Sequence, residues 1–216
     1  GGPNFPVDIK SQENFMSKNN EIDIYIPIEG EVGFSNIIEK SLASFSKNEF
    51  RQTILSENID GCIMRETNHN LRYNSVIRSK TLDEIPSPYL TGLLDKFFDG
   101  KLTPMLQTNR GCPFQCSYCV DGNTDVNIVN RFSVERTAQE IEYISSHVPT
   151  QTNSLIIADL NFGMIPTDSK TCDAIANAQE KYNYPKQISA STGKNSKSRI
   201  IDAIGRVNGA LRIWLS

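Results

Sequence analysis

The feature that most constrains this fold is an alternation of strand and helix patterns over residues 102–216. Four short runs rich in apolar or β-branched residues read as strands: Pro104–Thr108, Ser154–Ala158, Ile188–Ser191 and Ala210–Leu215. The connections between them are about 20 residues or longer, which is enough for a helical crossover between parallel strands. We therefore expect an α/β fold built from successive parallel βα units.

Helical patterns fill the three connections. Ser133 is an N-cap residue ahead of the first helix. Asp168 is the expected cap of the second helix, and Pro185 is expected to end it. A third helix is predicted over Lys197–Val207. The apolar positions of the first helix fall on one face, at Val134, Ala138, Ile141 and Ile144.

The first hundred residues have a different pattern. A β-branched strand is predicted over Ile22–Ile28, followed by a helix after Glu29-Gly30-Glu31. The runs Ile59–Arg65 and Leu71–Ile77 flank turn-forming residues and predict a hairpin. Residues 81–101 are expected to form a linker with a short helix over Tyr89–Phe98.

Composition indicates a globular chain. Of the 216 residues, 38% are hydrophobic and 22% are charged, and the formal charge of −3 supplies no basic field for nucleic acid. No apolar run reaches the roughly 18 residues that span a bilayer, so a cytoplasmic protein is expected. The sequence opens at Gly1-Gly2-Pro3 without Met and closes in the apolar run Ala210–Leu215, which suggests a fragment.

The cysteines point to a metal site. Cys112, Cys116 and Cys119 lie at spacings of four and three residues, while the chain has five cysteines in all. A loop with these spacings can wrap three thiolates around one iron–sulfur cubane and leave the fourth iron without a protein ligand. The alternative is a zinc site, but structural zinc takes four ligands, and His69 and His147 are both distant in sequence. Cys62 and Cys172 stand alone among apolar residues and are predicted to be core residues.

The segment Thr108-Asn109-Arg110-Gly111-Cys112-Pro113-Phe114-Gln115-Cys116-Ser117-Tyr118-Cys119 resembles the signature of the radical S-adenosylmethionine (radical SAM) family. The resemblance implies a [4Fe–4S] cluster on the three cysteines, with S-adenosylmethionine bound to the open iron through its amine and carboxylate. Tyr118 matches the aromatic position that lies against the adenine in this family. Ordinary loop packing is the alternative role for Tyr118.

Two further segments are similar to strand ends that contact the cofactor in this family. Ala158–Gly163 lies where the methionyl amine is met, which makes Asp159 and Asn161 candidate cofactor residues, although the family's usual Gly-Gly-Glu is missing. Ser191–Asn195 ends the next strand and makes Ser191 and Lys194 candidates, with a solvated loop as the alternative for Lys194. The implied fold is a partial (β/α)6 barrel, whose active face lies at the carboxyl ends of its strands.

The first 80 residues resemble the end of a doubly wound cobalamin-binding domain. The resemblance rests on Gly1–Pro6 and on Glu29-Gly30-Glu31, and it makes cobalamin a third expected cofactor. The expected organisation is a cobalamin-binding-like remnant over residues 1–80, a linker over 81–101 and the first part of a radical SAM barrel over 102–216.

The resemblance implies an enzyme that cleaves S-adenosylmethionine reductively to a 5′-deoxyadenosyl radical. Its reaction would functionalise, for example methylate, an unactivated carbon of a small molecule, lipid or surface sugar. A flavodoxin or ferredoxin is the expected reducing partner, and no side chain is assigned as catalytic. Two alternatives stay open, namely a transfer-RNA methylthiotransferase-like enzyme, which needs a basic surface, and a non-catalytic iron–sulfur electron carrier, which needs a fourth cysteine ligand.

Overall fold

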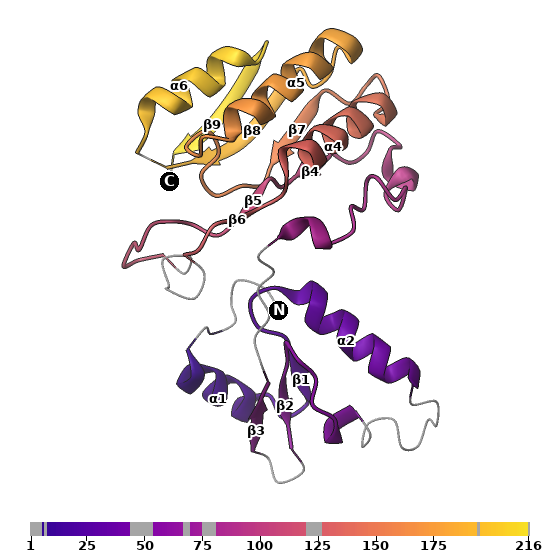
Figure 1. The fold of residues 1–216 in the computed structure, drawn as a ribbon, viewed down its shortest axis with the longest axis vertical. Coiled ribbons are helices and arrows are strands. Elements are labelled where there is room, and N and C mark those ends of the chain that lie inside the picture. Colours follow the sequence, from indigo (N-terminus) through magenta and orange to yellow (C-terminus); the bar gives the residue numbers. More distant parts are fainter. Residues whose placement is uncertain are drawn as a thin grey trace. The chain divides into compact units, whose positions relative to one another are not determined.

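The computed structural model describes residues 6, 8–43, 54–66, 70–74, 81–119, 127–193 and 195–215. The chain divides into two compact units (Figure 1). The first comprises Gly1–Ser79 with Ser117–Val126, and the second comprises Lys80–Cys116 with Asn127–Ser216. Each unit has buried hydrophobic residues of its own. Among the described residues, no helix is long and apolar enough to cross a membrane.

The second unit is built on a parallel sheet of four strands: β4 (Met105–Leu106), β7 (Ser154–Ile157), β8 (Gln187–Thr192) and β9 (Ala210–Leu215). Their order in the sheet, β4-β7-β8-β9, is the same as their order in the chain, and each pair is parallel. The prediction of successive parallel βα units is thereby confirmed. Within the described residues this sheet is open at β4 and β9, so the barrel stays a prediction.

Three helices follow the strands: α4 (Val134–His147), α5 (Asp168–Tyr182) and α6 (Lys197–Arg206). Figure 1 shows them side by side along the sheet. Alternate strand residues are buried against them, and the shared core includes Leu155, Ile157, Ile188, Ala190, Ile141, Ile144, Ile175 and Ala203. This period-two burial is what a sheet with helices on one face requires. Cys172 lies in the same core, as predicted.

The helix starts match the sequence prediction at one position and differ at another. Ser133 caps α4, because its hydroxyl accepts a hydrogen bond from the Arg136 N–H at 3.1 Å. Asp168, in contrast, is the first residue of α5 rather than its cap. Its Oδ2 accepts hydrogen bonds from the N–H groups of Gly163, at 2.7 Å, and Ile165, at 3.0 Å, and so fixes the loop that precedes the helix.

The predicted helix over Tyr89–Phe98 is wrong. The segment 81–101 consists of turns and two short 3-10 helices, η1 (Leu82–Glu84) and η2 (Asp95–Phe97). Gly92 has a φ of +72°, which an α-helix does not allow. The segment is tied to β4, because the Tyr89 hydroxyl donates to the Met105 carbonyl at 2.8 Å and accepts from the Met105 N–H at 3.1 Å.

A short antiparallel ribbon, absent from the sequence prediction, follows β4. It pairs β5 (Asn109–Arg110) with β6 (Asn130–Arg131). Phe132 extends it through a hydrogen bond of 3.0 Å from its N–H to the Thr108 carbonyl. The cysteine loop therefore begins after β5, and two residues separate β5 from β4.

The first unit contains α1 (Ile9–Lys18), β1 (Ile24–Tyr25), α2 (Gly30–Ala43), β2 (Ile63–Arg65) and β3 (Leu71–Tyr73). The predicted hairpin is confirmed between β2 and β3, although residues 67–69 of its tip and residues 75–77 of its second run lie outside the described residues. Cys62 is buried beside this hairpin, as predicted.

The doubly wound prediction for residues 1–80 does not match the described strands. The sheet order is β1-β2-β3 and both pairs are antiparallel, whereas a doubly wound sheet is mostly parallel. The link between β2 and β3 is too short for a crossover, so those two strands can only run antiparallel. Residues 1–5, on which the resemblance partly rests, lie outside the described residues.

The buried carboxyl of Asp168 predicts a pH-dependent stability. Only 2% of this residue is exposed, and burial raises its pKa from 3.8 to about 6. Below pH 3.8 the group is protonated in both folded and unfolded chains, so its raised pKa does not lower the free energy of unfolding there. Between the two pKa values the carboxyl is ionised in the unfolded chain but still protonated in the folded one. The free energy of unfolding therefore falls as the pH rises, by about 3 kcal/mol once the pH is above both values.

Asp168→Asn keeps an oxygen acceptor for Gly163 and Ile165 but cannot ionise. We expect the variant to unfold at higher denaturant concentration than the wild type above pH 6 and at a similar concentration near pH 4. Glu180→Gln, at an exposed position of the same helix, is the control and should leave the pH profile unchanged. A variant that is less stable than the wild type at every pH would show that the ionised carboxylate stabilises the loop.

Candidate functional site

The three clustered cysteines lie on the segment after β5. Cys112 and Cys116 are half-buried, Cys119 is exposed, and none is in a disulfide. Cys112 and Cys116 belong to the second unit, and Cys119 belongs to the segment Ser117–Val126 assigned to the first. Among the described residues no three His, Cys, Asp or Glu side chains are grouped to hold a metal ion. Convergence of the three thiolates therefore stays a prediction from their spacing.

The donor chemistry of these three cysteines fits an iron–sulfur cluster. None of the three is in a disulfide or fully buried, so each side chain is at least partly accessible to solvent. The other two cysteines are different, because burial raises the pKa of Cys62 to about 11 and that of Cys172 to about 12. A thiol with so high a pKa stays protonated at neutral pH and is a poor metal ligand. This difference supports the predicted set of three ligands, which stays a prediction.

Asp159, at the end of β7, is a hydrogen-bonding centre for the strand that leads into the cysteine loop. Its Oδ1 accepts from the N–H groups of Thr108, at 2.7 Å, and Asn109, at 3.2 Å. Its Oδ2 accepts from the Thr108 hydroxyl and, at 2.8 Å, from Asn109 Nδ2. Asp159 is 1% exposed, and its pKa is raised above the ordinary 3.8. Burial is the cause, and it outweighs the hydrogen bonds from Thr108 and Asn109, which lower the pKa.

These four bonds bear on the predicted role of Asp159 as a cofactor-binding residue. A carboxylate has about four lone-pair sites, and each is used here. No site is left for the amine of a bound cofactor, so the geometry favours Asn161 over Asp159 for that role. The sequence analysis assigns no function to Thr108 and Asn109, which here hold the Asp159 carboxylate. Their polar side chains directly before the Cys112 loop were the available signal.

Asn161 lies against the first cysteine. Its Nδ2 is 3.2 Å from Cys112 Sγ, and the residue is 5% exposed. On its other side is Gly193, just after β8, where an added Cβ would come within 2.8 Å of Asn161 Oδ1. The ends of β7 and β8 and the start of the cysteine loop thus meet at Asn161.

The remaining predicted cofactor residues, Ser191, Tyr118 and Lys194, lie in different surroundings. Ser191 lies in β8 and is half-buried, and its carbonyl accepts a hydrogen bond of 2.9 Å from the Phe162 N–H. Tyr118 exposes 85% of its surface, so its ring is not part of a hydrophobic core. Lys194 lies outside the described residues. Cofactor contacts of all these residues stay predictions.

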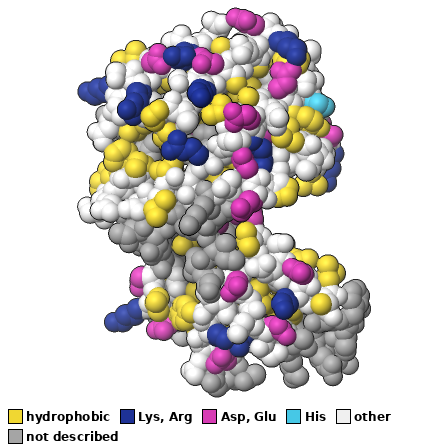
Figure 2. Space-filling model, viewed as in Figure 1, with side chains coloured by type: hydrophobic (Ala, Val, Ile, Leu, Met, Phe, Trp, Pro, Cys, Tyr) yellow, Lys and Arg dark blue, Asp and Glu magenta, His cyan; other side chains and the backbone are white. Residues whose placement is uncertain are grey.

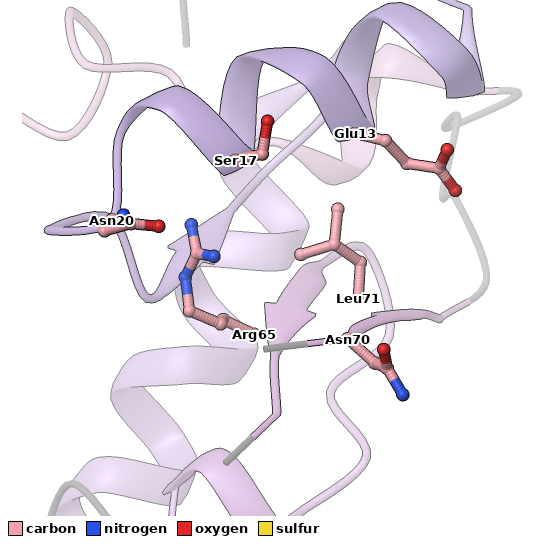
Figure 3. A pocket seen from close by; sticks show the side chains of 6 residues that line it. All are labelled: Glu13, Ser17, Asn20, Arg65, Asn70 and Leu71. Atoms are coloured by element: carbon pink, nitrogen blue, oxygen red, sulfur yellow. The ribbon is translucent and has the colours of Figure 1, made fainter. Parts of the chain in front are cut away.

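A pocket of about 450 Å³ in the first unit offers a weaker site. Figure 3 shows its lining residues, from α1, β2 and the segments beside them: Glu13, Ser17, Asn20, Arg65, Asn70 and Leu71. The guanidinium of Arg65 points toward the end of α1 and donates to the carbonyls of Met16, Asn19 and Ile22. Arg65 therefore satisfies carbonyl groups at and after the C-terminal end of α1, which is a structural role.

Two curated proteins are similar to most of this chain. It is 29% identical over 208 residues to the cobalamin-dependent radical SAM methyltransferase TokK of Streptomyces tokunonensis. It is 27% identical over 208 residues to the 2-(S-pantetheinyl)-carbapenam-3-carboxylate methyltransferase of Streptantibioticus cattleyicolor. Each match covers 94% of this chain but 28% of the relative, so the chain spans less than a third of either protein. No protein-family model matches the chain.

Solved structures share the fold. The cobalamin-dependent S-adenosylmethionine radical enzyme OxsB, with aqua-cobalamin and S-adenosylmethionine bound, matches with a TM-score of 0.63 at 18% identity, over 94% of this chain and 29% of that one. The radical S-adenosylmethionine methyltransferase TsrM from Kitasatospora setae, with tryptophan substrate and a SAM analogue bound, matches with a TM-score of 0.62 at 11% identity, over 92% and 38%.

The family resemblance of the cysteine segment thus agrees with independent likenesses in sequence and in fold. Over most of its length the chain is therefore similar to part of proteins that are named as cobalamin-dependent radical SAM enzymes.

Proposed function

We propose that this chain is the part of a radical SAM enzyme that binds a [4Fe–4S] cluster and S-adenosylmethionine, in a protein that methylates an unactivated carbon. The observation that carries the proposal is the spacing of Cys112, Cys116 and Cys119, three cysteines outside disulfides that follow the first strand of an in-order parallel sheet. Residues 102–216 would hold the cluster and S-adenosylmethionine, and residues 1–80 would belong to the cobalamin side of the protein.

Each candidate residue has a role that its setting supports. The thiolates of the three cysteines would bind three irons, and the bound cluster would supply the electron that cleaves S-adenosylmethionine. The exposed ring of Tyr118 offers a flat surface for the adenine. Within the described residues Asn161 Oδ1 accepts no hydrogen bond, so it is available to the methionyl amine. Ser191 and Lys194 are proposed as further polar contacts.

The relatives support a small-molecule substrate over a lipid or a surface sugar. The name of one includes a carbapenam carboxylate, and TsrM was solved with tryptophan. TokK and OxsB are named as cobalamin-dependent, and we extend cobalamin to this protein as its third cofactor. A flavodoxin or ferredoxin would supply electrons. A cluster that air destroys fits the reducing cytoplasm.

The two alternative functions have less support. A non-catalytic electron carrier needs a fourth cysteine ligand, but Cys62 and Cys172, the other two cysteines of the chain, are fully buried. A transfer-RNA enzyme needs a basic surface. On the face in Figure 2, Lys and Arg side chains are interspersed with Asp and Glu among the described residues, and the formal charge is −3.

The first test is metal binding. After anaerobic reconstitution, the full chain should hold about four irons and four sulfides and show the broad absorbance of a cubane. Replacing Cys112, Cys116 or Cys119 by Ala should abolish that absorbance, because each removes one of only three ligands. Cys62→Ala and Cys172→Ala are the matched controls and should retain full iron. Stoichiometric zinc in anaerobically purified protein, or full iron in one of the three variants, would contradict the proposal.

The second test concerns the adenine site. Loss of a stacked ring is worth about 1–3 kcal/mol, so Tyr118→Ala should weaken S-adenosylmethionine binding about 5- to 150-fold. Iron content should not change, because the thiolates remain. Tyr118→Phe keeps the ring and should keep the wild-type affinity. The measurement is the change in the cluster's EPR spectrum as S-adenosylmethionine is added. Equal affinities for all three proteins would remove Tyr118 from the site.

A further inference from the structure

The Asn161 amide is held in one orientation beside Cys112. Its Nδ2 lies 3.2 Å from Cys112 Sγ, and its Oδ1 faces Gly193. A thiolate sulfur only accepts hydrogen bonds, so the reverse orientation would set the amide oxygen against another acceptor. The contact is therefore an N–H···S hydrogen bond from a nearly buried donor.

The backbone around Asn161 fixes this contact from both sides. Its own carbonyl accepts from the Met164 N–H at 3.2 Å, and the Phe162 N–H is bonded to Ser191 of β8. A side chain at Gly193 would disturb this arrangement, because a Cβ there would lie 2.8 Å from both Asn161 Oδ1 and Met164 Sδ, and one or both of those side chains would have to shift.

We propose that Asn161 is a positioning residue for Cys112, and that its N–H···S bond raises the reduction potential of the cluster held by that thiolate. The inference rests on the proposed function, since it needs a cluster at Cys112. A reduced cluster has more negative charge on its sulfurs than an oxidised one. A hydrogen bond to a ligating sulfur therefore stabilises the reduced form more and makes the cluster easier to reduce.

The experiment is a redox titration of the anaerobically reconstituted full chain, followed by EPR. Asn161→Leu has nearly the same shape and no donor, so we expect full iron content with a more negative reduction potential. Gly193→Ala should also change the potential, because a Cβ 2.8 Å from Asn161 Oδ1 must move the amide relative to Cys112 Sγ. In the Asn161→Leu background the donor is already missing, so Gly193→Ala should add no further shift. Asn153→Leu, remote from the cysteine loop before β7, is the control.

The outcomes separate the two proposals. A wild-type chain that binds no cluster would overturn the proposed function and this inference with it. A wild-type cluster whose potential is unchanged by Asn161→Leu would overturn the inference alone. If Asn161→Leu holds less iron, Gly193→Ala decides the question, because it keeps the amide and only displaces it. An unchanged potential in that variant would likewise overturn the inference.

Discussion

The geometry of this site depends on one buried carboxylate. Asp159 accepts two hydrogen bonds on each oxygen from Thr108 and Asn109, and so joins the ends of β4 and β7. Four donors are what a buried charge needs, because an unpaired carboxylate in this position would be expensive. The chain reaches Cys112 only three residues after Asn109. The start of the cysteine loop is therefore set by this hydrogen-bond network at the ends of β4 and β7.

Features that depend on local sequence were predictable. The alternation of Ile188, Ala190 and Thr192 toward the core identifies β8, and the hydroxyl of Ser133 identifies the start of α4. The cysteine spacing predicts the three ligands from local sequence alone, because three thiols within eight positions are a local pattern. The predicted helix over Tyr89–Phe98 is wrong because Gly92 adopts a positive φ, and the spacing of apolar residues does not reveal a backbone angle.

Features that depend on distant partners were not predictable. Asp159 and Thr108 are 51 positions apart, and nothing in either segment shows that one donates to the other. The β5–β6 ribbon pairs Asn109 with Arg131 across the cysteine loop, which again is long-range. The first unit shows the same limit. Its strands were predicted from apolar runs in the sequence. Their antiparallel pairing depends on which strands lie next to each other in the sheet, and the residue pattern of a single strand does not carry that information.

The two polar residues of Asp159-Leu160-Asn161 illustrate how charge decides roles at such a site. The cluster proposed at Cys112 would be negatively charged, so its surroundings would favour hydrogen-bond donors over further carboxylates. Asn161, which can donate, lies against Cys112 Sγ, while the acidic Asp159 is directed to the donors of Thr108 and Asn109. An Asp at position 161 would set a carboxylate against a thiolate, and an Asn at 159 would set an amide N–H₂ against donors. The order of the two residues after β7 therefore suits the cluster proposed at Cys112.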